Sequence, residues 1–282
     1  MEILEHSLLT TKSYNLKGGL IQAEHNKSKQ WNTGDSAQSF NANKDDPRMD
    51  PKYITGPQIS YDMNSLGYRC DEISEYKDNE FIAVFGCSYT EGVGLHKEDL
   101  WHYHVGKELG LPVMNLGMGG TGIDYQTYNT ILYCKNKLPK PKLVMYQYPG
   151  EYRKLFRYPH GVQSWVSLSN EGDVTNTPQE KYDYEWYTNR YLVYPEQAKM
   201  YNFFNYQTIK LLWNQQNVPN YHWAWLDDYA PNDRDFNTIY TQDGIEGDEW
   251  GYPARDLQHP GSAVHLDVYQ QIIHGVKECL KK

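Results

Sequence analysis

Cysteine is scarce in this chain, and long apolar runs are missing. Only four of the 282 residues are cysteine, and no two have the spacing of a CxxC pair or a zinc site. Cysteines scattered in this way indicate reduced, buried thiols rather than a disulfide framework. No stretch approaches the roughly 20 apolar residues that a membrane-spanning helix needs. The sequence therefore predicts neither a disulfide-stapled scaffold nor a membrane span.

The chain also lacks a run of basic residues. It has 27 Lys and Arg against 36 Asp and Glu, a formal net charge of −9. This balance makes nucleic acid and anionic membranes poor candidates as partners. Residues 1–14 have neither a basic start nor an apolar centre, so they do not match a secretory signal peptide. We expect a soluble protein, in the cytoplasm or in an assembled particle, and the oligomeric state stays open.

Aromatic residues, by contrast, are abundant. They make up 15% of the chain, and 26 residues are Tyr. This composition fits a Tyr-rich core and surface, and it also fits a face that binds a sugar or a polymer. Residues 1–75 are polar and broken by Gly, Asn and Pro, so we interpret them as an N-terminal extension that packs on the core. Residues 76–282 form the main unit.

From residue 81 onward, short apolar segments alternate with segments of helical periodicity. The expected strands cover 81–85, 112–116, 142–148 and 220–226, and the expected helices cover 97–110, 123–137, 196–216 and 262–279. This alternation predicts an α/β fold, a three-layer α/β/α sandwich around a parallel sheet of about five strands. Residues 151–195, rich in Trp and Tyr, are interpreted as a lid or binding insertion. Residues 227–255 are expected to form a polar loop.

Three turns at the strand ends carry the chemically useful residues, because ligands of such sheets bind at the carboxyl ends of the strands. In the turn 86–92 (Gly-Cys-Ser-Tyr-Thr-Glu-Gly), Ser88 stands between a buried strand and a helix, as a nucleophile would. The glycines of the turn 115–122 leave backbone N–H groups reachable, as an oxyanion hole requires, although a simple tight turn has the same pattern. Asp256 precedes His259 by three residues. A carboxylate there can bond one ring nitrogen and leave the other free as a base, and a helix cap fits the same pattern.

Taken together, these segments resemble the conserved-block pattern of the SGNH (GDSL-like) hydrolases. Residues 86–92 are similar to the first block, G-D-S-x-x-x-G, residues 115–122 to the second, and residues 256–259 to the last, D-x-x-H. The resemblance covers residues 81–280, and the order and spacing of the blocks agree with it. It implies a flavodoxin-like sandwich and an esterase, lipase or acylhydrolase activity that needs no cofactor and no metal.

The resemblance also implies roles for single residues. Ser88 would be the nucleophile, His259 the general base and Asp256 the residue that orients it. The backbone N–H groups of Ser88 and Gly120 would donate to the oxyanion.

Two positions depart from the family pattern. Cys87 stands where the first block has Asp, which says little about activity. The family's third block, G-x-N-D, supplies an Asn as third oxyanion donor, but this chain aligns Glu151 at that position. Either Gln147 or Arg153 replaces the Asn, or catalysis is weak, or the site has been lost. One lost donor lowers a rate by roughly 10²–10³.

Other residues are weaker candidates. Residues 34–36 spell the literal Gly-Asp-Ser, but no apolar strand precedes them, so we interpret the match as chance. Asp227 and Asp228 follow the fourth expected strand and would line the site or cap a loop. His222, His265 and His274 could each act as a base but are interpreted as surface or core histidines with other partners. His96, His102 and His104 could bind a metal, but no carboxylate has the spacing of a metal ligand beside them.

The sequence thus leaves three functional hypotheses. The first is a serine esterase that removes an O-acetyl or other short acyl group, with a carbohydrate ester favoured over a long lipid chain by the Tyr-rich insertion. The second is a glycan-binding or structural protein that keeps the fold with an impaired site. The third is an acyltransferase that uses the same triad.

Overall fold

A computed structural model describes residues 16–17, 20–21, 29–32, 34–150, 153–157, 163–166, 195–224, 236–238 and 252–281. Five parallel strands form the central sheet in the order β4-β3-β5-β8-β9. Their bounds are Val113–Asn115 (β4), Ile82–Phe85 (β3), Leu143–Tyr148 (β5), Asn220–Ala224 (β8) and Phe236–Thr238 (β9). When these five strands are numbered by their place in the chain, their order across the sheet is 2-1-3-4-5, the flavodoxin-like doubly wound arrangement.

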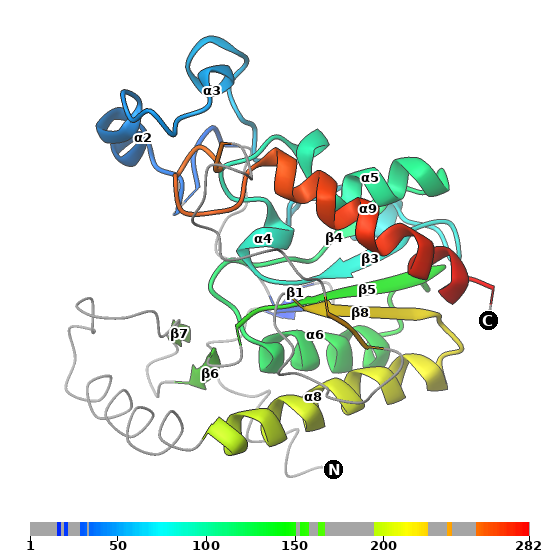
Figure 1. The fold of residues 1–282 in the computed structure, drawn as a ribbon. Helices are drawn as coiled ribbons and strands as arrows, with labels where there is room; N and C mark the ends of the chain where they lie inside the picture. The colour runs from blue at the N-terminus through cyan, green and yellow to red at the C-terminus, as the bar shows by residue number, and fades with distance from the viewer. Residues whose placement is uncertain are drawn as a thin grey trace.

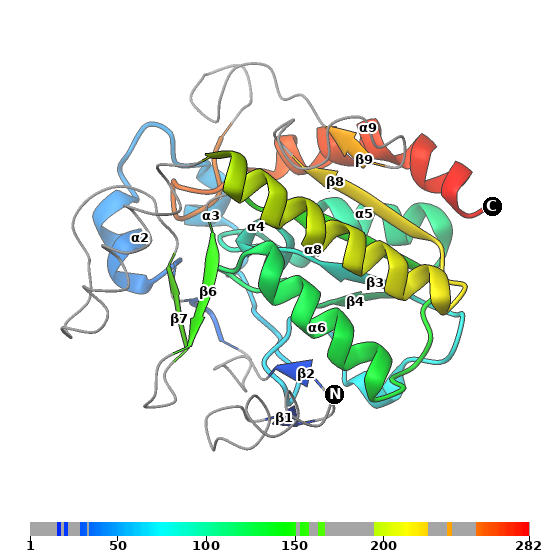
Figure 2. The same ribbon diagram turned by 90° about the horizontal axis from the view of Figure 1, so that it is seen from below.

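Two pairs of helices cover the two faces of the sheet (Figures 1 and 2). On one face α5 packs against α9, and on the other α6 packs against α8. Their bounds are Trp101–Leu109 (α5), Ser262–Cys279 (α9), Ile123–Lys135 (α6) and Pro195–Gln215 (α8). The predicted three-layer α/β/α sandwich is therefore confirmed, and all four expected strands and helices have their counterparts.

The strands divide their side chains between two cores with a period of two. Ile82 and Val84 of β3 join the cluster that contains Trp101 of α5 and Val268 of α9. Ala83 and Phe85 join the opposite cluster, which contains residues of α6 and α8. Because both faces are covered, β3 and β5 are buried along their whole length, which explains why their sequences are apolar except for Gln147.

One expectation about a loop needs correction. Residues 227–255 are not wholly loop, because Phe236–Thr238 form the fifth strand, β9, which pairs with β8. A strand of three residues is too short to leave a periodic signal. The aromatic insertion contains a hairpin of two antiparallel strands, Lys154–Arg157 (β6) and Gln163–Val166 (β7). Asp227 and Asp228 lie outside the described residues.

The N-terminal region supplies short elements, and two of them, the helices at 37–43 and 51–55, lie at the end of the sandwich where α4 (Ser88–Glu91) begins (Figure 1). These elements are β1 (Leu16–Lys17), β2 (Leu20–Ile21), α2 (Ala37–Asn43), α3 (Pro51–Thr55) and η1 (Ile73–Glu75), and η2 (Lys97–Asp99) precedes α5. A third apolar cluster joins Met49, Tyr53 and Tyr61 to Leu95 and Ala254. The extension therefore packs on the segments that follow Ser88 and precede His259.

None of the four cysteines forms a disulfide within the described residues. Cys70 and Cys87 are buried, as expected, whereas Cys134 and Cys279 are only half-buried. Among the described helices, none combines the length and apolarity needed to cross a bilayer.

Candidate active site

Ser88 is the first residue of α4, directly after the turn that ends β3. The turn is tight: a Cβ on Gly86 would lie 2.0 Å from Thr90 Oγ1, so only glycine fits there. Cys87 is extended and precedes the helix as its N-cap. Within the described part of the chain, neither the hydroxyl nor the backbone N–H of Ser88 makes a hydrogen bond. Both groups are therefore available to a ligand.

Gln147, at the end of β5, is hydrogen-bonded to this turn on its buried side. Its Oε1 accepts hydrogen bonds from the backbone N–H of Cys87 at 3.3 Å and from Thr90 Oγ1 at 3.2 Å. Its Nε2 donates to the Tyr148 carbonyl at 2.8 Å, and the side chain has no exposed surface. Gln147 thus supports the nucleophile turn from inside the protein.

The glycine-rich loop after β4 lies directly against α4. Asn115 Nδ2 donates to the Thr90 carbonyl at 2.8 Å, and a Cβ on Gly117 would lie 2.6 Å from the Glu91 nitrogen. This close approach brings the second turn beside Ser88. A Cβ on Gly119 would lie 3.7 Å from Ser88 Cβ.

Among the described residues the backbone N–H of Gly120 in this loop has no partner. Gly117 donates to Asn115 Oδ1, Met118 to the Gly86 carbonyl, Gly119 to Glu91 Oε2 and Thr121 to the Met118 carbonyl. Among the described residues Gly120 alone in 117–121 donates no hydrogen bond. Gly120 has φ +75°, a conformation that favours glycine. The predicted second oxyanion donor therefore has a free N–H among the described residues, as does Gly122 at the start of α6.

Asp256 and His259 form a hydrogen-bonded pair in the turn before α9. Asp256 Oδ2 bonds His259 Nδ1, while Oδ1 accepts the backbone N–H groups of Gln258 and His259, each at 3.1 Å. The carboxylate is almost fully buried, and the His side chain is 18% exposed. The arrangement fixes the ring and leaves Nε2 free to act as a base.

The turn that carries His259 is attached to the segment that follows Ser88. The Arg255 N–H donates to the Gly94 carbonyl at 3.0 Å, and the His259 ring meets Tyr89 edge-on at 5.4 Å between centroids. No hydrogen bond joins Ser88 Oγ to His259 Nε2 among the described contacts. Such bonds are often long without substrate and tighten when it binds. The structure thus brings the three predicted residues to one end of the sheet.

Of the third-block candidates, Glu151 lies outside the described residues. Arg153 directly precedes β6, and its carbonyl packs against Gly122 at the start of α6. Its Nη1 is buried without a hydrogen-bond partner. Burial raises the pKa of Tyr89 to about 12, and the positive charge of Arg153 opposes this rise. The Arg153 guanidinium therefore lies within electrostatic range of the residue next to Ser88.

Four of the other histidines have structural partners. His222 Nδ1 bonds the Tyr148 hydroxyl at 2.8 Å, His265 Nδ1 accepts the Trp101 N–H at 3.2 Å, and His102 Nε2 bonds the Thr90 carbonyl at 2.9 Å. Burial lowers the pKa of His102 and of His265 to about 3, so both are neutral near pH 7. His96 stacks on Tyr53. Across the described residues no three His, Cys, Asp or Glu side chains gather as a metal site.

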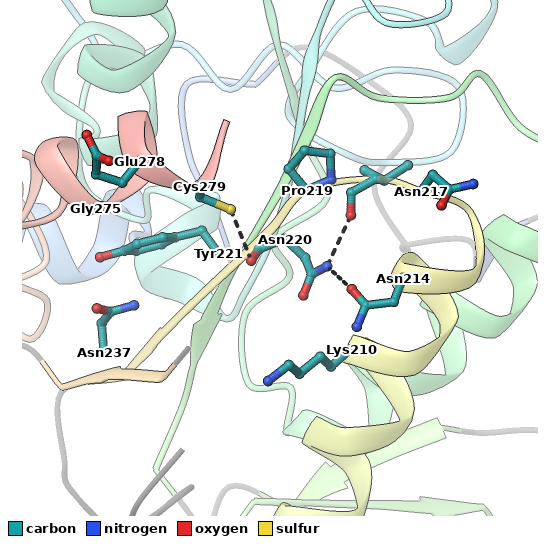
Figure 3. Close-up of a pocket in the computed structure, with 11 residues that line it drawn as sticks. Lys210, Asn214, Asn217, Pro219, Asn220, Tyr221, Asn237, Gly275, Glu278 and Cys279 are labelled. Atoms are coloured by element: carbon teal, nitrogen blue, oxygen red, sulfur yellow. Dashed lines mark hydrogen bonds between the residues drawn. The ribbon is translucent and has the colours of Figure 1, made fainter. Parts of the chain in front are cut away.

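A groove of about 540 Å³ lies elsewhere, where β8 begins (Figure 3). Asn214, Asn220, Tyr221 and Asn237 line it, and the thiol of Cys279 donates to the Asn220 carbonyl at 3.4 Å. Asn214, Asn237 and Cys279 come from α8, β9 and α9, respectively. Asn220 and Tyr221 lie at the amino end of β8, opposite the strand ends that carry Ser88. The groove therefore does not belong to the candidate active site.

Two residues that contact the candidate active site were not singled out from the sequence. Glu91 carries the carboxylate that accepts the Gly119 N–H at 2.6 Å, and Asn32 Nδ2 donates to the same carboxylate at 2.5 Å. The spacing of Glu91 from Ser88, three residues along a helix, places both on one face and could have identified Glu91. Nothing in the sequence around Asn32 points to this contact.

Comparison with known proteins finds only remote likeness. No protein-family model matches the sequence, and no curated protein matches it. One matching solved structure is an acetyl xylan esterase from the rumen bacterium Butyrivibrio proteoclasticus, at 11% identity and a TM-score of 0.43. The alignment covers 73% of this chain and 65%, less than two thirds, of that esterase. Another is a proposed acylhydrolase from Bacteroides fragilis, at 14% identity and a TM-score of 0.31, over 74% of this chain and 93% of that one.

Proposed function

We propose that this chain is a serine esterase of the SGNH type that hydrolyses a short acyl ester through an acyl-enzyme. The observation that carries the proposal is the group at one end of the sheet: an unbonded Ser88 hydroxyl, two free backbone N–H groups at Ser88 and Gly120, and the Asp256–His259 pair. Nucleophile, oxyanion donors and oriented base are the parts that acyl transfer needs.

The reaction would proceed in two displacements. Ser88 Oγ attacks the ester carbonyl carbon while His259 Nε2 takes the hydroxyl proton, and Asp256 stabilises the imidazolium that forms. The tetrahedral oxyanion accepts hydrogen bonds from the N–H groups of Ser88 and Gly120. Collapse breaks the bond to the alcohol oxygen, which leaves with the proton from His259. Water then attacks the acyl-enzyme by the same route, releasing the carboxylic acid and restoring Ser88.

Arg153 is our candidate for the third oxyanion contact. Gln147 is already engaged by Cys87, Thr90 and Tyr148 and has no exposed surface. The buried Nη1 of Arg153, by contrast, has no partner. A guanidinium near the developing negative charge would take over the role of the family's Asn by electrostatic attraction.

For the substrate we propose an O-acetyl or other short acyl group on a carbohydrate. The half-exposed Tyr89 ring, in contact with His259, offers the flat apolar surface on which a sugar ring can lie. The aromatic residues of 151–195 motivated the same preference, and most of them lie outside the described residues.

A fluorophosphonate probe tests the nucleophile without knowledge of the substrate. We expect covalent labelling of the wild type and of Ser36→Ala, the serine of the literal Gly-Asp-Ser, and no labelling of Ser88→Ala. p-Nitrophenyl acetate hydrolysis above background should follow the same order. Wild type and Ser88→Ala behaving alike in both assays would contradict the proposal.

The second candidate is a glycan-binding protein with an impaired site. It is favoured by the missing hydrogen bond between Ser88 Oγ and His259 and by the carboxylate of Glu91 next to the glycine loop. This candidate predicts no labelling of the wild type but binding of a glycan. An acyltransferase would label like an esterase, so product analysis with a sugar acceptor separates those two.

A further inference from the structure

The literal Gly-Asp-Ser at 34–36 is not a nucleophile block, yet it lies beside the proposed active site. A Cβ on Gly34 would lie 4.0 Å from His259 Cε1. The turn that contains it is closed by two backbone hydrogen bonds between Asn32 and Asp35, at 3.0 and 3.2 Å. The side chains of these same two residues reach the two sides of the site.

Asn32 reaches the glycine-rich loop through Glu91. Asn32 Nδ2 donates to Glu91 Oε1 at 2.5 Å, and Glu91 Oε2 accepts the Gly119 N–H at 2.6 Å. Glu91 is only 8% exposed, so both hydrogen bonds are shielded from water. The peptide that bears the Gly120 N–H begins at Gly119. Its position therefore depends on the contact between Gly119 and Glu91.

Geometry rather than charge explains why a carboxylate stands there. A Cβ on Gly119 would lie 3.0 Å from Glu91 Oε2 and 3.7 Å from Ser88 Cβ, so Glu91 and Ser88 flank the same glycine. A negative charge at this distance opposes a developing oxyanion. What Glu91 supplies is an acceptor for the Gly119 N–H, and a neutral amide would supply the same acceptor.

Asp35 reaches the other side of the site through Arg255, the residue before Asp256. Arg255 Nη2 donates to Asp35 Oδ2 at 2.6 Å and to the Gln30 carbonyl at 2.7 Å. Arg255 and Asp35 are each 1% exposed, and the guanidinium lies 4.1 Å from the Trp31 ring centroid. In Figure 1 the loop before α9 (orange) lies between that helix and the N-terminal helices α2 and α3.

We propose that the turn Asn32–Asp35 is a positioning element of the active site. Asn32, through Glu91, sets the Gly120 oxyanion donor, and Asp35, through Arg255, sets the turn that bears His259. None of these four side chains touches the reacting atoms. The inference rests on the proposed esterase function and adds the residues that arrange its two sides.

The test compares Glu91→Ala, Glu91→Gln and Asn32→Ala, with Gln38→Ala, an exposed residue of α2, as control. The measured quantities are the second-order rate of fluorophosphonate labelling at Ser88 and kcat and KM for p-nitrophenyl acetate, each on protein shown to be folded by circular dichroism. We expect Glu91→Ala to lower the labelling rate and kcat by about 10–10²-fold with little change in KM. Asn32→Ala should lower them less, and Glu91→Gln should recover most of the loss.

Two results would overturn the inference while leaving the esterase proposal standing. One is wild-type labelling with Glu91→Ala reacting at the rate of Gln38→Ala, which would make Glu91 merely structural. The other is Glu91→Gln reacting as slowly as Glu91→Ala, which would mean that the charge acts and not the position. A wild type that is neither labelled nor active would overturn both proposals together.

Discussion

Removing the carboxylate of Asp35 should destabilise the whole protein, because it leaves a buried cation without its partner. Arg255 donates three hydrogen bonds to Asp35, from Nε at 3.0 and 3.1 Å and from Nη2 at 2.6 Å. In Asp35→Ala the guanidinium keeps the Gln30 carbonyl, a long contact to Gln58 at 3.4 Å and its aromatic neighbours. Breaking one side of such a pair costs about 3–5 kcal/mol.

The assay is urea unfolding followed by tryptophan fluorescence, with the free energy of unfolding extrapolated to water. The free energy of unfolding should decrease less in Asp35→Asn than in Asp35→Ala, since an amide oxygen still accepts a hydrogen bond from Arg255. The matched control is Asp46→Ala, which removes the carboxylate of the exposed pair with Arg48, where no measurable change is expected. If Asp35→Ala unfolds within about 1 kcal/mol of Asp46→Ala, the ion pair does not hold the two segments together, and the reasoning is refuted.

Three further predictions concern the site and its pH dependence. Gly120→Ala should lower fluorophosphonate labelling by about 10-fold or more in a folded protein, because alanine is strained at φ +75° and the free N–H moves; labelling at the wild-type rate would contradict this role. Asp256→Asn should lower kcat for p-nitrophenyl acetate by about 10²–10⁴, since the amide no longer selects the required tautomer of His259; an unchanged kcat would exclude the pair. Burial lowers the pKa of His265 to about 3 in the folded protein, against about 6.5 in the unfolded chain. Between these pH values the unfolded chain binds more protons, so the free energy of unfolding decreases as the pH is lowered. His265→Gln should reduce this loss between pH 6 and pH 4 by about 1.4 kcal/mol per pH unit, as measured by urea unfolding at each pH.

The fold follows from the sequence wherever a segment is buried on both sides. β3 is apolar throughout, β5 is interrupted only by Gln147, and α9 repeats Val264, Val268, Ile272 and Val276 at helical spacing, so the layers and the ends of the strands could be predicted. β9 could not, because only three residues pair at the edge of the sheet and all three are half-buried. The position of β9 is set by its pairing with the edge of β8, a contact between segments that are separated in the chain.

The candidate site was predictable to the extent that its residues follow strands. Ser88, Gly120, Asp256 and His259 were all expected from turns at the carboxyl ends of strands or before the last helix. The role of Gln147 was not, because an amide at the end of a buried strand gives no sign of whether it faces a ligand or the turn beside it. Its three accepted hydrogen bonds, from Cys87 and Thr90, exist only once β3 and β5 are neighbours.

The N-terminal turn was the hardest part to predict, because its partners are distant in the chain. Asp35 and Arg255 are 220 residues apart, and Asn32 and Glu91 are 59 apart. This turn makes two separate contacts, which we call the Asp35 arm (Asp35 to Arg255) and the Glu91 arm (Asn32 to Glu91 to Gly119). We expect the first to act on stability and the second on reactivity. The Asp35 arm ends on a fully buried cation, so its loss should appear mainly in the free energy of unfolding. The Glu91 arm ends on a backbone N–H beside Ser88, so its loss should appear mainly in the rate of acylation. Opposite rankings of Asp35→Ala and Glu91→Ala in the two assays would show that one turn contributes to both properties through separate contacts.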